Sequence, residues 1–308
     1  MRATELEPAW LRTRERGSLP LLHFMIWVTL RLGRSAGRVL LPPIVLYFAI
    51  FSPRARAASR SFLGRALGRP AGFGDVLRHY YTFAATVLDR VYFLSGRWRD
   101  LDLRLHGHER LLETLERGRG CILLGSHLGS FEALRAAAVF GANWQFAMIM
   151  DNANAQKVAR TFAALNPELA ATIIESGAPD SLIRAKERLD AGAMLGLLGD
   201  RLRPGDRPVP TPFLGDTVRF PTGPFAAAAA LGAPVMLCFG LYRGGRRYDL
   251  HFEPFLDRLA LPRSGRAEAL AATVRDYAAR LEHYARLAPY NWFNFFDVWA
   301  DPDDARRR

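Results

Sequence analysis

The chain has 308 residues, half of them hydrophobic, which is enough for one large domain or two small ones. Its formal net charge of +12 and its pI near 10.4 favour anionic partners such as acidic lipid headgroups, an acidic protein or nucleic acid. The sequence has no zinc-finger spacing, basic zipper or aromatic RNA-binding motif, so we expect no nucleic-acid partner.

The chain opens with two short apolar runs, residues 19–32 and 39–51, with arginines between and after them. Each run is shorter than the ~20 apolar residues of a spanning helix. Three interpretations remain open: an anchor lying in one leaflet, one run extended across the bilayer, or two core helices of a soluble protein. The first two are favoured. The arginine-rich flank then predicts that the rest of the chain lies on the cytoplasmic side of an inner membrane.

An amphipathic helix is predicted over residues 73–94, and from residue 101 short strands alternate with helices. We predict strands near 101–106, 121–126, 145–150, 171–175, 194–199, 234–242 and 248–253, and helices near 108–117, 130–140, 153–165, 179–191, 222–231 and 265–287. The expected fold is α/β, a mixed central sheet flanked by helices, after an N-terminal hydrophobic helical membrane anchor. We expect three segments: a membrane-associated helical region (1–97), an α/β domain (98–300) and a charged tail (301–308).

The most informative stretch is residues 120–132, GCILLGSHLGSFE. Its apolar run is typical of a strand covered on both faces, and Ser130 is placed to cap the helix that follows. If both residues lay on one helix, the five positions from His127 to Glu132 would turn through about 500°, which puts the two side chains on different faces. They can meet only if His127 lies in the turn before the helix, where Glu132 would hold one ring nitrogen and leave the other as a base. The alternative is a helix cap with a first-turn acidic residue.

Neither neighbouring serine lies in a Gly-x-Ser-x-Gly elbow, so the dyad has no nucleophile of its own. Its simplest chemistry is to deprotonate a hydroxyl of a substrate.

A second polar block follows the predicted strand at 194–199. Asp200, Arg201 and Arg203 lie where a strand ends, which is where ligands bind in α/β sheets. Thr222 and Gly223 then open an Ala-rich helix, whose start suits anions. A plain helix cap explains these last two residues equally well.

Cofactor and metal motifs are missing from the sequence. It has no dinucleotide fingerprint and no phosphate-binding Walker motif, and the remaining histidines have no companions at metal-ligand spacing. We therefore expect neither a cofactor nor a metal. Cys121 and Cys238 lie in apolar runs and are predicted to be buried free thiols.

Taken in order, these blocks resemble a known family. HLGSFE fits the His-x4-Asp/Glu signature of glycerolipid acyltransferases. The following loop with Asp200, then PFLG, PTG and an Ala-rich helix ending GAPV, is similar to the late lauroyl and myristoyl acyltransferases of lipid A biosynthesis. The resemblance extends over most of the chain from about residue 101 and more loosely to its N-terminus.

The resemblance implies an O-acyltransferase that moves a fatty acyl group from acyl carrier protein or coenzyme A to a hydroxyl of a membrane lipid or glycolipid. It assigns His127 as the general base and Glu132 as the residue that orients it. Substrate contacts are expected from residues of the two polar blocks: Ser126, Gly129, Ser130, Asp200, Arg201, Arg203, Arg219, Thr222 and Gly223. The expected partners are acyl carrier protein and anionic membrane lipids.

The acceptor remains open. The segment 290–296, YNWFNFF, lacks the basic residues common in this family, so another lipid-linked acceptor is as consistent as lipid A itself. Two rival functions are a lipid hydrolase that activates water with the same dyad, and a non-catalytic membrane scaffold.

Overall fold

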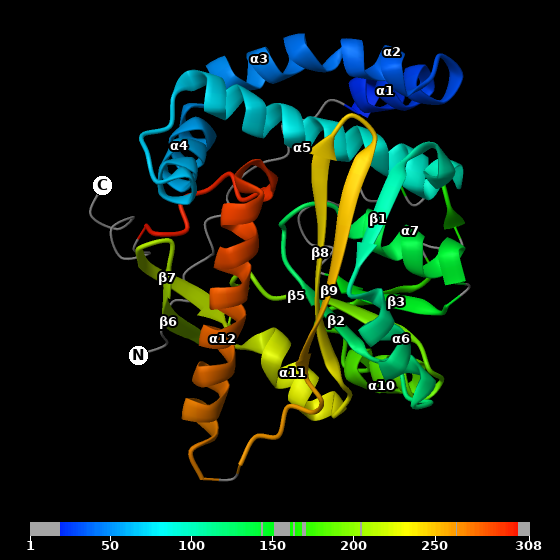
Figure 1. Ribbon diagram of the computed structural model, residues 1–308, viewed down its shortest axis with the longest axis vertical. Coiled ribbons are helices and arrows are strands. Elements are labelled where there is room, and N and C mark those ends of the chain that lie inside the picture. Colours follow the sequence, from blue (N-terminus) through cyan, green and yellow to red (C-terminus); the bar gives the residue numbers. More distant parts are fainter. Residues whose placement is uncertain are drawn as a thin grey trace.

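A computed structural model of the chain describes residues 19–142, 144–150, 161–162, 164–167, 171–203, 205–262 and 264–300 (Figure 1). The described residues 19–100 contain helices and their connections, without a strand. The helices are α1 (Leu19–Arg31), α2 (Arg34–Val39), α3 (Leu41–Phe51), α4 (Pro53–Leu67) and α5 (Phe73–Leu94), and a short 3-10 helix, η1 (Arg97–Asp100), follows.

The two apolar runs have nearly all of their length in α1 and α3, and both helices pack along α5 (Figure 1). Within the described residues one stretch, Arg34–Phe51, is long and apolar enough to cross a membrane, and 22% of it is buried. Helix α4 was not predicted. Pro53 sits in its first turn, where a missing N–H costs nothing, and Arg56 donates through Nη1 to the carbonyl of Ala49 at 2.6 Å, which caps the end of α3.

From η1 onward strands and helices alternate. The sheet has seven strands in the order β1-β9-β8-β2-β5-β3-β4, and β8 and β9 pair antiparallel while all other neighbours pair parallel. Its strands are β1 (Asp102–His106), β2 (Ile122–Gly125), β3 (Phe146–Met150), β4 (Ile173–Glu175), β5 (Met194–Leu198), β8 (Val235–Gly244) and β9 (Arg247–Leu256). The predicted mixed α/β sheet is confirmed.

Helices cover both faces of this sheet, because successive strand residues point to opposite sides. Ile122 and Leu124 of β2 join one hydrophobic core with α4, α10 (Ser181–Asp190), α11 (Gly223–Leu231) and α12 (Arg266–Leu287). Cys121 and Leu123 join the other, with α5, α6 (His108–Glu116) and α7 (Phe131–Ala142). Both cysteines are buried and free, as predicted, and burial raises the pKa of the Cys121 thiol to about 12.

One hairpin was missed. Strands β6 (Pro208–Phe213) and β7 (Asp216–Pro221) form a separate antiparallel pair beside α12 (Figure 1). Pro208, Pro210 and Pro212 made a strand look improbable. They alternate, however, so the residues between them supply the N–H groups of the ladder. The helix predicted over 153–165 and the charged tail fall mostly or wholly outside the described residues.

A buried carboxylate joins the helical part to the sheet. Asp89 of α5 has a fully buried side chain and accepts hydrogen bonds from Arg34 Nε (2.7 Å), Arg38 Nη2 (2.8 Å) and the hydroxyl of Tyr248 in β9 (2.7 Å). Burial is the largest influence on the pKa of Arg38 and would lower it, but the charge of Asp89 together with the contacts of Tyr242 and Tyr81 raises that pKa overall. Helix α2 is thereby fixed to both α5 and β9.

Candidate active site

The turn after β2 carries His127, as the sequence predicts. Ser130 caps α7 by accepting a hydrogen bond from the N–H of Ala133 at 3.2 Å, which confirms the predicted start of this helix. The side chains of Ser126 and Ser130 are both buried, and the Ser126 hydroxyl oxygen accepts from the N–H of Leu128 at 3.2 Å. Both serines thus shape the turn, and their predicted contact with substrate stays a prediction.

The turn is pressed against the sheet and the C-terminal segment. Gly129 has φ of 81°, and a Cβ atom there would lie 2.0 Å from the carbonyl oxygen of Gly240 in β8, so only glycine fits. Its N–H donates to the carbonyl of Asn291 at 2.8 Å, and the N–H of Phe293 donates to the carbonyl of His127 at 2.8 Å. The backbone that carries His127 is therefore held from two sides.

The side-chain partner of His127 is Asp200. This residue follows β5, the strand hydrogen-bonded to β2, so the carboxyl ends of two parallel strands bring the pair together. Nδ1 of His127 lies 2.8 Å from Oδ1 of Asp200, and the N–H of His127 donates to Oδ2 at 3.0 Å. A carboxylate at Nδ1 fixes the tautomer with its proton there, which leaves Nε2 as the basic nitrogen.

Asp200 is held by further donors from the C-terminal segment. Trp292 donates through Nε1 at 3.0 Å and Asn294 through Nδ2 at 3.1 Å, both to Oδ2. Burial alone would raise the pKa of the Asp200 carboxyl, yet the hydrogen bonds and charge of His127 and the charge of Arg201 hold it well below its usual range. Asp200 is therefore ionised at neutral pH.

The electrostatics keep His127 neutral. Burial lowers the pKa of His127 below its ordinary value, the charge of Arg201 lowers it further, and Asp200 opposes both. The imidazole is still 28% exposed, so its free nitrogen is open to a substrate. Arg201 donates to the side chain of Asn294 at 2.7 Å, and burial lowers its pKa to about 10, which leaves it cationic at neutral pH.

The expected contact between His127 and Glu132 is wrong. Glu132 instead forms an ion pair with Arg90 of α5, and the structure brings none of its oxygens within salt-bridge distance of His127 among the described residues. Glu132 belongs to the first turn of α7, beyond the Ser130 cap, and it faces α5 rather than the sheet edge. The acidic partner of the imidazole thus comes from the neighbouring strand, not from the neighbouring turn.

The geometry can now be compared with known proteins. A sequence model of the bacterial lipid A biosynthesis acyltransferases matches residues 82–300, which include the His127 turn, Asp200 and the C-terminal segment. The chain belongs to that family. A comparison with curated proteins finds no match. As a member of the lipid A acyltransferase family, the chain is an acyltransferase of lipid A-type biosynthesis.

Asp200 and Arg201 of the second polar block belong to the dyad site of this acyltransferase, whereas Arg203, Thr222 and Gly223 make their contacts with other residues. The Thr222 hydroxyl donates to the carbonyl of Arg207 at 2.9 Å, and Gly223 lies against the Asp206 carboxylate. Arg203 donates from its backbone to Asp206 at 2.8 Å and from its side chain to Ser176. Within the described residues no hydrogen bond or ion pair joins Arg203, Thr222 or Gly223 to His127 or Asp200, although the charge of Arg203 contributes to lowering the pKa of His127. Their role in substrate binding stays a prediction.

Arg219 lies on β7, opposite Pro210 in the hairpin register, and is exposed. Like Arg203, Thr222 and Gly223, it has no described hydrogen bond or ion pair with His127 or Asp200. Its expected contact with phosphate or carrier protein remains a prediction.

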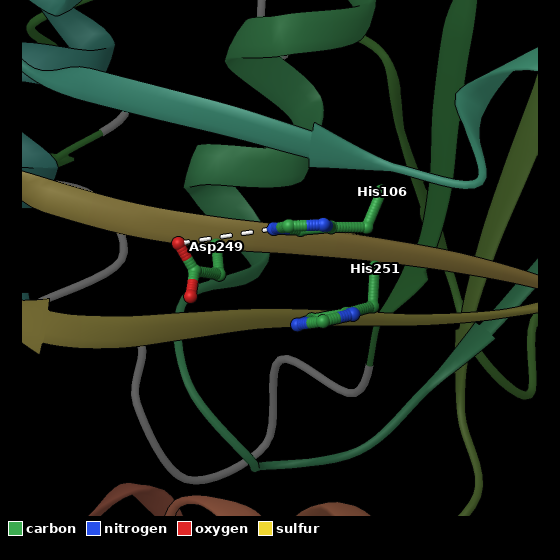
Figure 2. A group of neighbouring side chains, drawn as sticks. All are labelled: His106, Asp249 and His251. Carbon is green, nitrogen blue, oxygen red and sulfur yellow. Dashed lines mark ion pairs between the residues drawn. The ribbon is translucent and has the colours of Figure 1, made fainter.

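One cluster resembles a metal site. His106 at the end of β1 and Asp249 and His251 of β9 have ligand atoms within 4.8 Å of one another (Figure 2), although the sequence spacing showed no such companions. Two facts disfavour a cation. Arg243 and Arg247 already occupy both oxygens of Asp249 at 2.8–3.0 Å. The two imidazole rings also stack in near-parallel planes, with their centroids 4.6 Å apart. A metal ion bound by a histidine lies close to the plane of its ring, so one ion could not lie in both ring planes.

Sequence reasoning missed the residues that position the dyad. Trp292 and Asn294 lie in the segment 290–296, which the sequence comparison distinguished only by its missing basic residues, and His79 lies in no motif. His79 is buried, and it is hydrogen-bonded to the Ser59 hydroxyl at 2.8 Å and to the carbonyl of Trp292 at 2.9 Å. The sequence does contain a signal for Asp200. Two buried strands each end in a glycine followed by polar residues, Gly125-Ser126-His127 and Gly199-Asp200.

Proposed function

We propose that this acyltransferase moves a fatty acyl group from a thioester to a hydroxyl of a membrane lipid or glycolipid, with His127 as the general base. The observation that carries the proposal is the pairing of Nδ1 with buried Asp200 while Nε2 stays available on a partly exposed ring. The thioester is carried by acyl carrier protein or coenzyme A, and no cofactor takes part.

In the proposed reaction, Nε2 takes the proton of the acceptor hydroxyl as its oxygen attacks the thioester carbonyl carbon. The C–S bond then breaks, and the protonated imidazole returns the proton to the leaving thiolate. Asp200 keeps the tautomer and stabilises the imidazolium. The role that the resemblance gave to Glu132 passes in this proposal to Asp200. The charge of Arg201, close enough to lower the pKa of His127, also favours the oxyanion of the tetrahedral intermediate.

The protein is proposed to act on the cytoplasmic side of an inner membrane; the family is typically membrane-associated. Exposed aromatic and aliphatic side chains support this, among them Phe24 and Trp27 on α1 and Tyr47, Ile50 and Phe51 on α3. Helices α1 and α3 both pack along α5, and α2 is tied to Asp89, so spanning would break those contacts. This favours an anchor lying in the plane of the leaflet.

The proposal is tested by mass spectrometry of lipids after incubation of purified protein with membranes and either acyl carrier protein or coenzyme A thioester. We expect one lipid class to gain a single acyl mass, and the His127→Ala variant, verified to be folded by circular dichroism, to lose this activity by about 10²- to 10⁴-fold. Release of free fatty acid without a lipid product would instead support the hydrolase. Equal turnover by the folded variant would exclude His127 as the base.

A further inference from the structure

A cavity of about 620 Å³ lies outside the dyad site, between α2, α5, the β8–β9 turn and the segment before Trp292. Four arginines line it: Arg34, Arg38, Arg78 and Arg243. We call it the arginine pocket. No aspartate or glutamate is among its lining residues, and neither is His127.

Positive charge in the arginine pocket exceeds the carboxylates behind it. Arg34 and Arg38 share the single carboxylate of Asp89, and Arg243 shares Asp249 with Arg247. The lining of the pocket therefore carries a net positive charge that attracts an anion. Two or more guanidinium groups face a space large enough for a lipid headgroup.

Two arginines of the pocket have N–H donors without a partner among the described residues. Arg78 stacks on the ring of Tyr290 at 4.3 Å and has no hydrogen bond or ion pair from its guanidinium within the described part of the chain. The Nε atom of Arg38 is buried and likewise without a partner among the described residues. A buried donor left unpaired is costly, and a phosphate oxygen is the acceptor that best matches a guanidinium fork.

The surroundings of the pocket select a lipid rather than a soluble anion. Leu32, two residues before Arg34, and Val39, the residue after Arg38, are 63% and 73% exposed. They continue the exposed apolar surface of α1 and α3. An amphiphile could place its phosphate in the pocket and its chains along this surface.

We propose that the arginine pocket binds the phosphate of a membrane lipid headgroup, with phosphomonoesters preferred for their higher charge. This assignment is independent of which hydroxyl is acylated. It also places the bound lipid beside the catalytic turn, because Asn291 lines the pocket and its carbonyl accepts the N–H of Gly129 at 2.8 Å.

The test is vesicle flotation with the full chain, using phosphatidylcholine vesicles that contain either phosphatidic acid or phosphatidylglycerol at equal surface charge. The test variant is Arg78→Gln/Arg243→Gln. Its matched control is Arg184→Gln/Arg188→Gln, which removes the same charge from the exposed face of α10. Asp249 keeps Arg247 in the test variant, and Arg78→Gln alone provides a second variant that disturbs no ion pair.

We expect the test variant to bind phosphatidic acid vesicles about tenfold or more weakly, and the control to match the unmodified chain within about twofold. Equal losses in both variants would show a diffuse charge effect and overturn the pocket. Calorimetric titration with pyrophosphate tests whether the pocket binds a soluble anion instead. Tight pyrophosphate binding that phosphatidic acid vesicles cannot displace would assign the pocket to a soluble anion. Acyl transfer, measured separately on each variant, keeps this outcome distinct from failure of the proposed reaction.

Discussion

Asp200 and Asp89 are both fully buried carboxylates, but their partners differ. Asp200 accepts from His127, Trp292 and Asn294, so one titratable ring shares it with neutral donors. Asp89 accepts from two arginines and a tyrosine, none of which changes charge near neutral pH. The first arrangement leaves the Nε2 atom of His127 available to accept a proton, whereas the second joins helices α2 and α5 to the sheet through donors that keep their charge. Burial of a carboxylate alone therefore does not distinguish a reactive site from a structural one.

Removing the structural carboxylate should have the largest effect. In Asp89→Ala, Arg34 and Arg38 lose their shared partner while they remain mostly buried. We expect the free energy of unfolding to fall by roughly 3–5 kcal/mol, measured by urea denaturation. Asp216→Asn is the control, because the Arg65–Asp216 pair is largely exposed. Equal stability of the two variants would mean that the Asp89 cluster does not hold α2 in place.

Changing the carboxylate at the dyad should affect activity more than stability. Asp200→Asn removes the charge that steadies the imidazolium, so we expect roughly 10²- to 10³-fold lower kcat. Glu132→Gln, which weakens only the pair with Arg90, should cost less than tenfold. A larger loss in Glu132→Gln than in Asp200→Asn would return the orienting role to Glu132.

Acid should weaken the region around His79. Burial lowers the pKa of His79 to about 4, against about 6.5 in an unfolded chain. The folded-state pKa is depressed, so its contribution is fully present above pH ~6.5 and is lost as the pH falls toward 4. The loss should be on the order of 3 kcal/mol. His127, whose pKa is also lowered, acts in the same direction.

Thermal unfolding of the unmodified chain and of His79→Gln between pH 7 and pH 4 measures this contribution. The variant should begin less stable and show a flatter pH dependence. Parallel curves would show that His79 does not titrate in this window.

The smallest effect is expected at His106, Asp249 and His251. Because two arginines occupy Asp249, micromolar zinc should shift neither Tm nor activity. A rise in Tm of several degrees that is lost in His251→Ala would establish a metal site there.

Most of the fold was predictable from local pattern. Buried runs such as residues 121–125 and 194–198, with glycine or proline at their ends, gave the strands nearly to the residue. The β6–β7 hairpin was not predictable in this way, because prolines at alternate positions have low strand propensity and mask the pattern of a strand. The acidic partner of His127 was not predictable from local pattern either, because the order of strands in a sheet is a tertiary property. Nothing in the sequence shows that β5 lies beside β2, and the acidic residue five positions away was the only local choice.

The contacts of Trp292 and Asn294 with Asp200 bear on how the enzyme matures. Most of the sheet can form from the first 256 residues, but the dyad acquires its supports only when the stretch around residues 291–294 docks on the His127 turn. A chain shortened by a protease before Asn291 would keep every strand of the sheet, while Asp200 would lose the donors Trp292 and Asn294. The geometry of the His127–Asp200 pair thus depends on a segment that comes later in the sequence than the whole sheet.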